Sequence, residues 1–340
     1  MMKNKKEKKK TSLIVKFIKV FLVCIAVIAL TVFGAYKLVT YQWQDEPKEY
    51  PVTNQYITAL GDTMVSAHRA GRNLFPQGTM MAFEGCVNAE DFETDIFEFD
   101  VRITSDERLI ILHDDTLDKI TDAVEHFKRE ENYPENYTYG EIYELNFGEG
   151  FKDKDGKTPY KGLRGDKIPD NLRVATAEEA LSYLEKSGKY YYSIEIKNGG
   201  ELGFKAADIL YDILSDMKLV DRVIVASFDK DILHYLDEKY PDLTRTGYNI
   251  EVFGLYLDSL FDIDRPEGYY KFDVLQVPPD RYIVNLGTSK LVNYAHKNNI
   301  AVQYWTINDE ERMTFLQSIG TDGIITDVPD VAYDVLNERE

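Results

Sequence analysis

The sequence predicts an α/β fold, a (β/α)₈ TIM barrel that carries a small insertion and follows one transmembrane helix. Candidate strands alternate with amphipathic helical stretches from about residue 62 onward, giving about eight repeats in roughly 270 residues. Such alternation implies right-handed crossovers and a parallel sheet, which eight repeats can close into a barrel. An open doubly wound sheet is the alternative, but no Gly-rich phosphate loop follows the first strand.

Two simple patterns give the expected elements. Short apolar runs bounded by polar turns predict strands, and an apolar period of about 3.6 residues predicts helices. Strands are expected at 64–68, 96–101, 109–113, 191–196, 223–227, 244–248, 274–277, 301–305 and 323–326. Helices are expected at about 79–88, 176–187, 203–217, 229–239, 288–298 and 309–319.

The N-terminal region predicts a membrane anchor. A basic head precedes 17 residues without a charge, Val20 to Tyr36, which lie between Lys19 and Lys37. This run is at the short end for a membrane span, and lysines that reach outward at both ends extend it. The basic head predicts that the N-terminus stays in the cytoplasm and that the remainder is exported to the extracellular side. A cleaved signal peptide is the alternative.

We therefore expect a cytoplasmic tail (1–19), a transmembrane helix (20–40), a polar stalk (41–61) and a barrel (62–337). Residues 115–170 interrupt the barrel rhythm, because they are rich in charged residues, Tyr and Gly and lack a long apolar period. A segment of this kind predicts a surface insertion. Its tyrosines either contact the alcohol part of a substrate or belong to a solvated loop.

Charge divides the chain at the end of the anchor. Residues 1–40 hold nine lysines and one glutamate, so removing their +8 from the net charge of −19 leaves −27 on residues 41–340. An acidic body excludes nucleic acid as a partner, because nucleic-acid affinity comes mostly from Lys and Arg on phosphates. The two cysteines, Cys24 and Cys86, imply no disulfide framework.

The stretch from Met64 to Asp115 holds the candidate site. His68 and His113 each end an apolar run, and Glu98 and Asp100 close a third run between them. Residues two apart in a strand point to the same face, so the two carboxylates can aim at one point. Because the chemistry of a (β/α)₈ barrel collects at the carboxyl ends of its strands, these four groups predict an active site.

A third carboxylate, Glu195, ends a later strand, and Lys197 follows two residues beyond. Without a cation, Glu98, Asp100 and Glu195 would repel one another. Carboxylate ligands without cysteine suit one hard divalent cation, Mg²⁺ or Ca²⁺. These three residues are the expected metal ligands. The alternative is that they are rim charges paired with Arg69 and Lys197.

Several motifs, in this order and at this approximate spacing, resemble the signature of the glycerophosphodiester phosphodiesterase family in its membrane-anchored bacterial form. They are His68-Arg69, Pro76 to Thr79 with Ala82-Phe83, Glu98-Phe-Asp100-Val101, His113-Asp114 with Asp118 and Thr121, Tyr192 to Lys197, Gln303 to Asn308, and Gly320 to Pro329. The resemblance implies a barrel of the phospholipase-C-like phosphodiesterase type and the same three metal ligands. It also implies hydrolysis of glycerophosphodiesters to sn-glycerol 3-phosphate and an alcohol.

For such a reaction the barrier is the charge that builds on the phosphoryl oxygens and the leaving alkoxide. Arg69 is suited to a bidentate contact with phosphate, and Lys197 adds a point charge. His68 and His113 can titrate near neutral pH, so one would deprotonate the nucleophile while the other protonates the leaving group. The nucleophile is open between water held by the metal and a neighbouring hydroxyl of the substrate. Trp305 is expected either in a wall of the substrate pocket or in the core.

Other polar residues have simpler explanations. His126, His234 and His296 are expected to be structural or on the surface, the last two because they fall within helices. Asp322 and Asp327 flank the last strand and are open between turn or cap residues and site groups.

Two positions depart from the family pattern and bear on the substrate. Gln77 replaces the usual Glu in Pro76-Gln77-Gly78-Thr79, and Ala70 stands where the first Gly after His-Arg is common. The leading hypothesis is a membrane-anchored, metal-dependent phosphodiesterase outside the cytoplasm, in phospholipid or polyglycerol-phosphate metabolism, with a small or lipid-derived diester as substrate. The alternatives are a lysophospholipase D or phospholipase-type phosphodiesterase, and a catalytically idle binding protein of the cell envelope.

Overall fold

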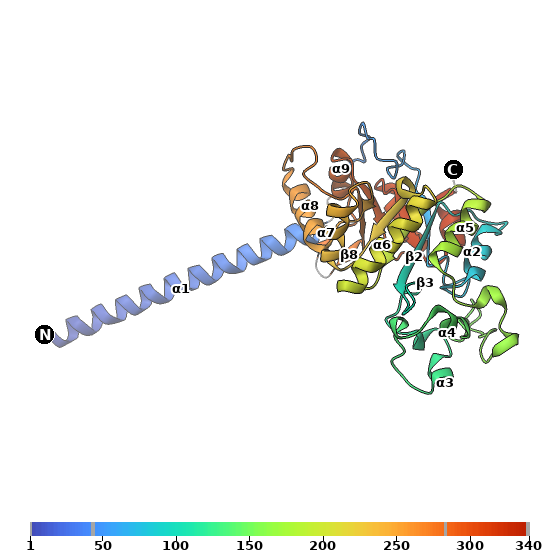
Figure 1. The fold of residues 1–340 in the computed structure, drawn as a ribbon. Helices are drawn as coiled ribbons and strands as arrows, with labels where there is room; N and C mark the ends of the chain where they lie inside the picture. The colour runs from blue at the N-terminus through green and yellow to red at the C-terminus, as the bar shows by residue number, and fades with distance from the viewer. Residues whose placement is uncertain (1, 42–44, 282–283, 338–340) are drawn as a thin grey trace.

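A computed structural model describes residues 2–41, 45–281 and 284–337 (Figure 1). Eight parallel strands form a nearly closed barrel in the order β6-β5-β4-β2-β1-β11-β10-β7. A parallel bridge between Thr246 and Val274 brings the two end strands together. The expected TIM barrel is confirmed. Its strands are β1 (Met64–His68), β2 (Ile96–Ile103), β4 (Tyr191–Ile196), β5 (Val223–Ala226), β6 (Thr244–Arg245), β7 (Val274–Val277), β10 (Ala301–Tyr304) and β11 (Gly323–Thr326).

The run expected as a strand at 109–113 is not part of the barrel path. β3 (Leu109–Ile111) pairs antiparallel with the far end of β2. The reason is that β2 continues beyond the barrel to Ile103 and turns back through residues 104–108. The returning strand brings His113 to the rim of the barrel, where Leu112 N donates to Asp100 O over 3.0 Å.

Helices surround the barrel, and capping side chains mark where several of them begin. Thr176 and Glu179, for example, form a reciprocal capping box at the start of α5. Among the outer helices, two lie where none was expected, α8 (Asn249–Phe261) and α11 (Pro329–Asn337). The first is apolar on both faces, since Phe253 is exposed while Leu255 is buried, which weakens its period. The outer helices are α2 (Met80–Val87), α5 (Ala177–Ser187), α6 (Gly200–Asp216), α7 (Lys230–Lys239), α8 (Asn249–Phe261), α9 (Ser289–Lys297), α10 (Glu310–Ser318) and α11 (Pro329–Asn337).

The segment from 115 to 170 forms a small lobe beside the barrel (Figure 1). It contains the short helices α3 (Ala123–Phe127) and α4 (Tyr139–Tyr143). Short 3₁₀ helices occur at Leu117–Lys119, Pro134–Asn136, Gly165–Lys167 and Asp170–Leu172, and another, Val220–Arg222, directly precedes β5 in the barrel. A separate apolar cluster, which includes Leu117, Ile142, Leu145 and Phe147, is buried under this lobe.

The N-terminal helix α1 (Met2–Thr40) projects from the body, and its segment Val15–Leu38 is long and apolar enough to cross a membrane (Figure 1). Its C-terminal end contacts β9 (Val284–Asn285), which forms a small hairpin with β8 (Asp280–Arg281) after β7. Residues 45–60 then run along α9 and across the amino ends of the barrel strands. Asp45 N donates to Ser289 Oγ over 2.7 Å, and Tyr56 is buried against the lower ends of the strands.

Candidate active site

A cavity of about 580 Å³ opens at the carboxyl ends of the barrel strands. Its lining includes six of the residues expected from sequence to do chemistry, together with Trp305, which forms part of the wall: His68, Arg69, Glu98, Asp100, His113, Glu195. Lys197 does not line the cavity itself, but its Nζ atom reaches Glu195 Oε1 at 2.8 Å. The side chains expected from sequence therefore meet at one place.

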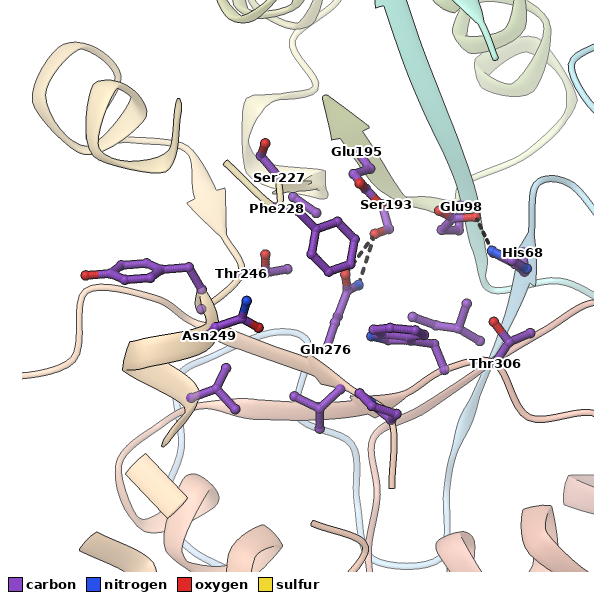
Figure 2. Close-up of a pocket in the computed structure, with 18 of the residues that line it drawn as sticks. His68, Glu98, Ser193, Glu195, Ser227, Phe228, Thr246, Asn249, Gln276 and Thr306 are labelled. Atoms are coloured by element: carbon purple, nitrogen blue, oxygen red, sulfur yellow. Dashed lines mark hydrogen bonds and ion pairs between the residues drawn. The ribbon is translucent and has the colours of Figure 1, made fainter. Parts of the chain in front are cut away.

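Strand register explains why they converge. In the parallel pair β1 and β2, His68 lies beside Glu98, and in the pair β2 and β4, Asp100 lies beside Glu195. Laterally paired residues of a parallel sheet point to the same side, and so do residues two apart on one strand. Figure 2 shows Glu98 and His68 facing each other, with Oε2 and Nε2 separated by 3.9 Å.

His68 is held from behind by Asp327, directly after β11. Nδ1 of His68 lies 2.5 Å from Oδ1 of Asp327, whose two oxygens also accept from Arg72 Nε at 2.7 Å and Asn308 Nδ2 at 2.9 Å. Burial works against ionisation, but the hydrogen bonds from His68 and Arg72 keep the pKa of Asp327 well below its usual range. An ionised Asp327 requires a proton on Nδ1, so Nε2 faces the cavity as the reactive nitrogen.

His113 reaches the cavity from the turn after β3. Its Nδ1 atom is buried without a hydrogen bond in the described chain, and Asp114 Oδ1 lies 3.6 Å away. Despite partial burial, His113 and Lys119 keep the pKa of Asp114 well below its usual range. The second histidine therefore has an anionic neighbour but a looser hold than His68.

Two cationic side chains, Arg69 and Lys197, lie between the three carboxylates. Arg69 donates its backbone N–H to Glu98 Oε2 over 2.8 Å and places its side-chain Nε 3.3 Å from Asp100 Oδ2. Lys197 Nζ lies between Glu195 and Asp100, 3.6 Å from Oδ1 of the latter. The ion pairs that we considered as an alternative to metal ligation are thus present.

These pairs do not fully compensate the carboxylates. Burial, followed by repulsion from Asp100, raises the pKa of Glu98 well above its usual range and raises the pKa of Glu195 as well. Oδ2 of Asp100 is buried and accepts no hydrogen bond in the described chain. When all three carboxylates are ionised, the two cations leave one negative charge in excess, which is unfavourable in a buried site.

The donor chemistry suits a divalent cation, although the carboxylates are not gathered around a single point. Within the described ranges no three His, Cys, Asp or Glu side chains stand close enough together to hold a metal ion as they are. Oxygen donors from Glu98, Asp100 and Glu195 are nevertheless the kind that Mg²⁺ and Ca²⁺ prefer. The excess charge, and the Asp100 oxygen that accepts no hydrogen bond from the described residues, both fit such an ion.

The loop that departs from the family pattern contacts this site. Gln77 Oε1 accepts a hydrogen bond from Arg69 Nη1 over 3.0 Å, so the amide holds the arginine that was expected to bind phosphate. Gly78 has φ +76°, and a Cβ there would lie 2.6 Å from Ile111 O. The glycine is therefore required for the turn that brings Gln77 to Arg69.

The other half of the cavity is lined mainly by apolar side chains, with the polar residues Thr246 and Asn249 among them (Figure 2). Phe228 and Trp305 pack edge to face with ring centroids 6.3 Å apart. Across from them, α8 and β9 contribute Val252, Phe253 and Val284 to the lining. The residues that line the cavity in the described ranges lie outside 115–170, so the tyrosines of the insertion are not among them.

Some residues of the site were not expected from sequence. From sequence, Asp327 could be either a turn or cap residue or a member of the site. Its contact with His68 makes it part of the site. Its position directly after a strand was the available signal. Ser193 and Gln276, hydrogen-bonded over 3.0 Å inside the barrel (Figure 2), carry no such signal, since polar residues within apolar strands are common in cores. Among the other histidines, His296 is buried and pairs with Asp322, with Nε2 2.9 Å from Oδ2, so its role is structural.

Comparison with known proteins places this geometry in context. A model described as the glycerophosphoryl diester phosphodiesterase family matches residues 68–331. A glycerophosphodiester phosphodiesterase of Bacillus altitudinis is 25% identical over 282 residues, which cover 82% of this chain and 100% of the relative. One from Caldanaerobacter subterraneus is 26% identical over 276 residues, covering 81% of this chain and 98% of the relative.

Solved structures show the same fold. A glycerophosphodiester phosphodiesterase of Agrobacterium tumefaciens matches with a TM-score of 0.59 and 17% identity, over 80% of this chain and 99% of that one. A phosphodiesterase of Oleispira antarctica, solved in complex with the product sn-glycerol-3-phosphate, matches with a TM-score of 0.60 and 18% identity. This second match covers 82% of this chain and 98% of the other.

Proposed function

Because the chain belongs to the glycerophosphoryl diester phosphodiesterase family, and is therefore a phosphoric diester hydrolase, we propose that it cleaves glycerophosphodiesters outside the cytoplasm with the help of one divalent cation. The products are sn-glycerol 3-phosphate and an alcohol, in phospholipid or polyglycerol-phosphate metabolism. The observation that carries the proposal is the meeting of His68 and His113 with three carboxylates and Arg69 in one cavity.

In this proposal Arg69 holds the non-bridging oxygens of the phosphate. Its side chain is almost fully buried and is fixed by Gln77 and Asp100, so little rotational freedom is lost when a diester binds. Lys197 adds positive charge from behind Glu195. Preorganised cations of this kind lower the barrier by stabilising the charge that develops on the phosphoryl oxygens.

The two histidines move the protons. Asp327 accepts a hydrogen bond from Nδ1 of His68, which leaves Nε2 facing the cavity to take the proton of the nucleophile. His113, on the other side of the carboxylates, would give a proton to the leaving alcohol. The nucleophile stays open between water and a hydroxyl of the substrate.

Members of the family generally use a divalent metal. Glu98, Asp100 and Glu195 would hold it, because they are the carboxylates that line the cavity and a cation would offset their mutual repulsion. When bound, Mg²⁺ or Ca²⁺ would neutralise charge on the phosphoryl oxygens. Arg69 and Lys197 would then be less occupied by these carboxylates and more available to phosphate.

A panel assay tests the activity. The full chain in detergent is given glycerophosphocholine, glycerophosphoethanolamine, glycerophosphoglycerol and a lysophospholipid, with EDTA or with added Mg²⁺ or Ca²⁺. We expect release of sn-glycerol 3-phosphate from at least one short diester, with activity lost in EDTA and restored by a cation. Hydrolysis of no diester under any metal condition would contradict the proposal and would favour an idle binding protein of the cell envelope.

We also propose that α1 crosses the membrane once, with its lysine-rich end in the cytoplasm and the barrel outside. The apolar span of α1 and the basic residues that precede it support this orientation. Protease added to intact cells should digest or release the barrel. Complete protection in intact cells, with digestion only after lysis, would place the barrel in the cytoplasm.

A further inference from the structure

An exposed apolar face lies beside the mouth of the cavity. On α8, Ile250 is 72% exposed, Phe253 is 52% exposed and Phe261 is 60% exposed. Their spacing of three and eight residues puts them on one side of the helix. Phe228, 61% exposed, joins them at the mouth, where it and Phe253 both line the cavity. We call Phe228, Ile250, Phe253 and Phe261 the apolar rim.

The position of α1 indicates what covers this rim. The C-terminal end of α1 contacts β9, and Val284 of β9 lines the same cavity as Phe253. In Figure 1, α1 leaves the body on the side where α8 lies, whereas the lobe with α3 and α4 lies away from it. If α1 spans a membrane, the membrane surface therefore lies against the mouth of the barrel.

The segment after α1 keeps the body in this orientation. Lys48 N donates to Asn293 Oδ1 over 2.9 Å, and Asn54 N donates to Asn299 Oδ1 over 3.0 Å, so the segment follows α9 from its first turn to its end. Thr58 N then donates to Oδ1 of Asp322, which lies directly before β11 at the amino end of the barrel. Because residues 45–58 are bound along the body, they cannot act as a long flexible spacer that would let it turn away.

Local charges are compatible with contact with lipid. The acidic residues at the end of α8 and in the following turn are each paired with a cation. Asp258 pairs with Arg265 at 2.7 Å, Asp262 pairs with Lys290 at 2.9 Å, and Asp264 pairs with Lys297. The rim therefore presents aromatic and aliphatic side chains beside neutralised acids, which suits the interface of a bilayer.

We infer that the apolar rim docks into the surface of the same phospholipid bilayer that α1 spans, so that the active site takes diesters lying in that membrane. This inference rests on the proposed function and adds glycerophosphodiesters with a hydrocarbon tail, such as lysophospholipids, to the short diesters of its substrate class. The tail would occupy the apolar half of the cavity, between α8, β9 and Trp305. In the reaction, oxygen of water or of the glycerol hydroxyl bonds to phosphorus and gives up its proton, and the bond from phosphorus to the headgroup oxygen breaks. That oxygen leaves with a proton as the alcohol, and the acylated glycerol keeps the phosphate.

The test compares two substrates with the same leaving group. The full chain in phosphatidylcholine nanodiscs receives either lysophosphatidylcholine in the disc or soluble glycerophosphocholine, and choline release is measured for both. The variant Ile250→Asp/Phe261→Asp changes two rim residues that do not line the cavity. The control is Val124→Asp, an exposed aliphatic residue on α3 in the lobe away from α1.

We expect the double variant to lose at least tenfold in kcat/KM on lysophosphatidylcholine and to stay within twofold of the unchanged chain on glycerophosphocholine. The Val124→Asp control should stay within twofold on both. An equal effect of the double variant on both substrates, or no effect on either, would overturn the inference. If the unchanged chain cleaves glycerophosphocholine but not lysophosphatidylcholine, the inference fails while the proposed function stands. If it cleaves neither, the inference fails, and the full panel of diesters then decides the proposed function.

A second measurement does not depend on activity or on folding of the Asp variants. A fluorophore is attached at Phe261→Cys or at Val124→Cys in a Cys24→Ser background, in which the remaining native Cys86 is buried. Spin-labelled lipids in the disc should quench the probe at 261 and leave the probe at 124 unaffected. Equal quenching at both positions would overturn the docking surface. If the probe at 261 is not quenched and the labelled chain forms dimers, the rim instead binds a second copy of the chain, which would also overturn the inference.

Discussion

Oδ1 of Asp327 lies 2.5 Å from Nδ1 of His68, and the same carboxylate is held by Arg72 and Asn308. The contact links the end of β11 to the end of β1, two strands that are neighbours in the barrel. It fixes which nitrogen of His68 faces the phosphate. A carboxylate that orients a histidine in this way contributes to turnover without touching the substrate.

Replacing Asp327 by Asn should therefore lower kcat by about 10- to 100-fold, the usual cost of losing an orienting carboxylate. KM should change little, because Asp327 contacts His68 and not the cavity. Steady-state kinetics on the best short diester measure both quantities. A kcat within twofold of the unchanged chain would show that His68 does not depend on this contact.

Asp322 offers a matched control, since it forms a similar pair with His296, 2.9 Å apart, at the opposite end of the same strand. Asp322→Asn removes the same charge from a buried histidine pair outside the cavity. We expect kcat, normalised to folded protein, to stay within twofold. A loss equal to that of Asp327→Asn would mean that both substitutions act through general stability.

Gln77→Glu should reduce kcat/KM on the native diester. The neutral amide already orients Arg69, so a carboxylate adds no new contact. It would instead bind the guanidinium more tightly and place a negative charge near the phosphate. An increase in kcat/KM would contradict this expectation and show that a negative charge at position 77 helps Arg69 to bind the phosphate. A change below twofold, about 0.4 kcal/mol, would put the position outside the working site.

Cation binding should stabilise the fold. A ligand that binds only the folded state stabilises it by about 2.7 kcal/mol at 100 times its Kd, so Mg²⁺ or Ca²⁺ should raise the Tm of EDTA-treated protein. In Asp100→Asn the donor at the centre of the carboxylates is weakened, and the rise should be several-fold smaller at the same cation concentration. The same Tm rise in both proteins would place the cation elsewhere.

The ion pair on α8 predicts a pH-dependent stability. Hydrogen bonds from Arg265 and Tyr270 lower the pKa of the buried Asp258. A lowered folded pKa stabilises the protein above the unfolded value of about 3.9, and this stabilisation is lost as the pH falls through the folded pKa. Asp258→Asn should cost about 1–2 kcal/mol at pH 7, because Arg265 is partly in water, and clearly less at pH 3. Denaturant unfolding at the two pH values measures the difference, and equal costs at both would contradict the ion-pair account.

Much of the fold could be predicted because parallel barrel strands are short, buried and separated by helices, which leaves a strong pattern. β3 could not be placed from this pattern, since a buried apolar run carries no information about the direction in which it pairs. α8 was missed because Phe253 and Phe261 are apolar on its exposed side, which removes the contrast that marks an amphipathic helix. The feature that hid the helix from sequence is the one that we assign to the membrane.

The site could be predicted where chemistry is coupled to strand ends. His68, Glu98, Asp100 and Glu195 all follow that rule, and β-sheet register then sets them side by side. Asp327 obeys the same rule but has an ordinary alternative as a turn residue, so only the contact with His68 identifies it. The place of Lys197 behind Glu195, rather than in the cavity lining, depends on side-chain packing that no spacing encodes.

The central claim is that His68 and His113 carry the proton transfers of diester hydrolysis. The most direct measurement is kcat for release of sn-glycerol 3-phosphate by the full chain and by His68→Ala and His113→Ala, with the cation saturating and folding checked by circular dichroism. Loss of a general acid or base predicts a decrease of about 10²- to 10⁴-fold in each variant. Turnover at the level of the unchanged chain in a folded His113→Ala or His68→Ala protein would contradict the account.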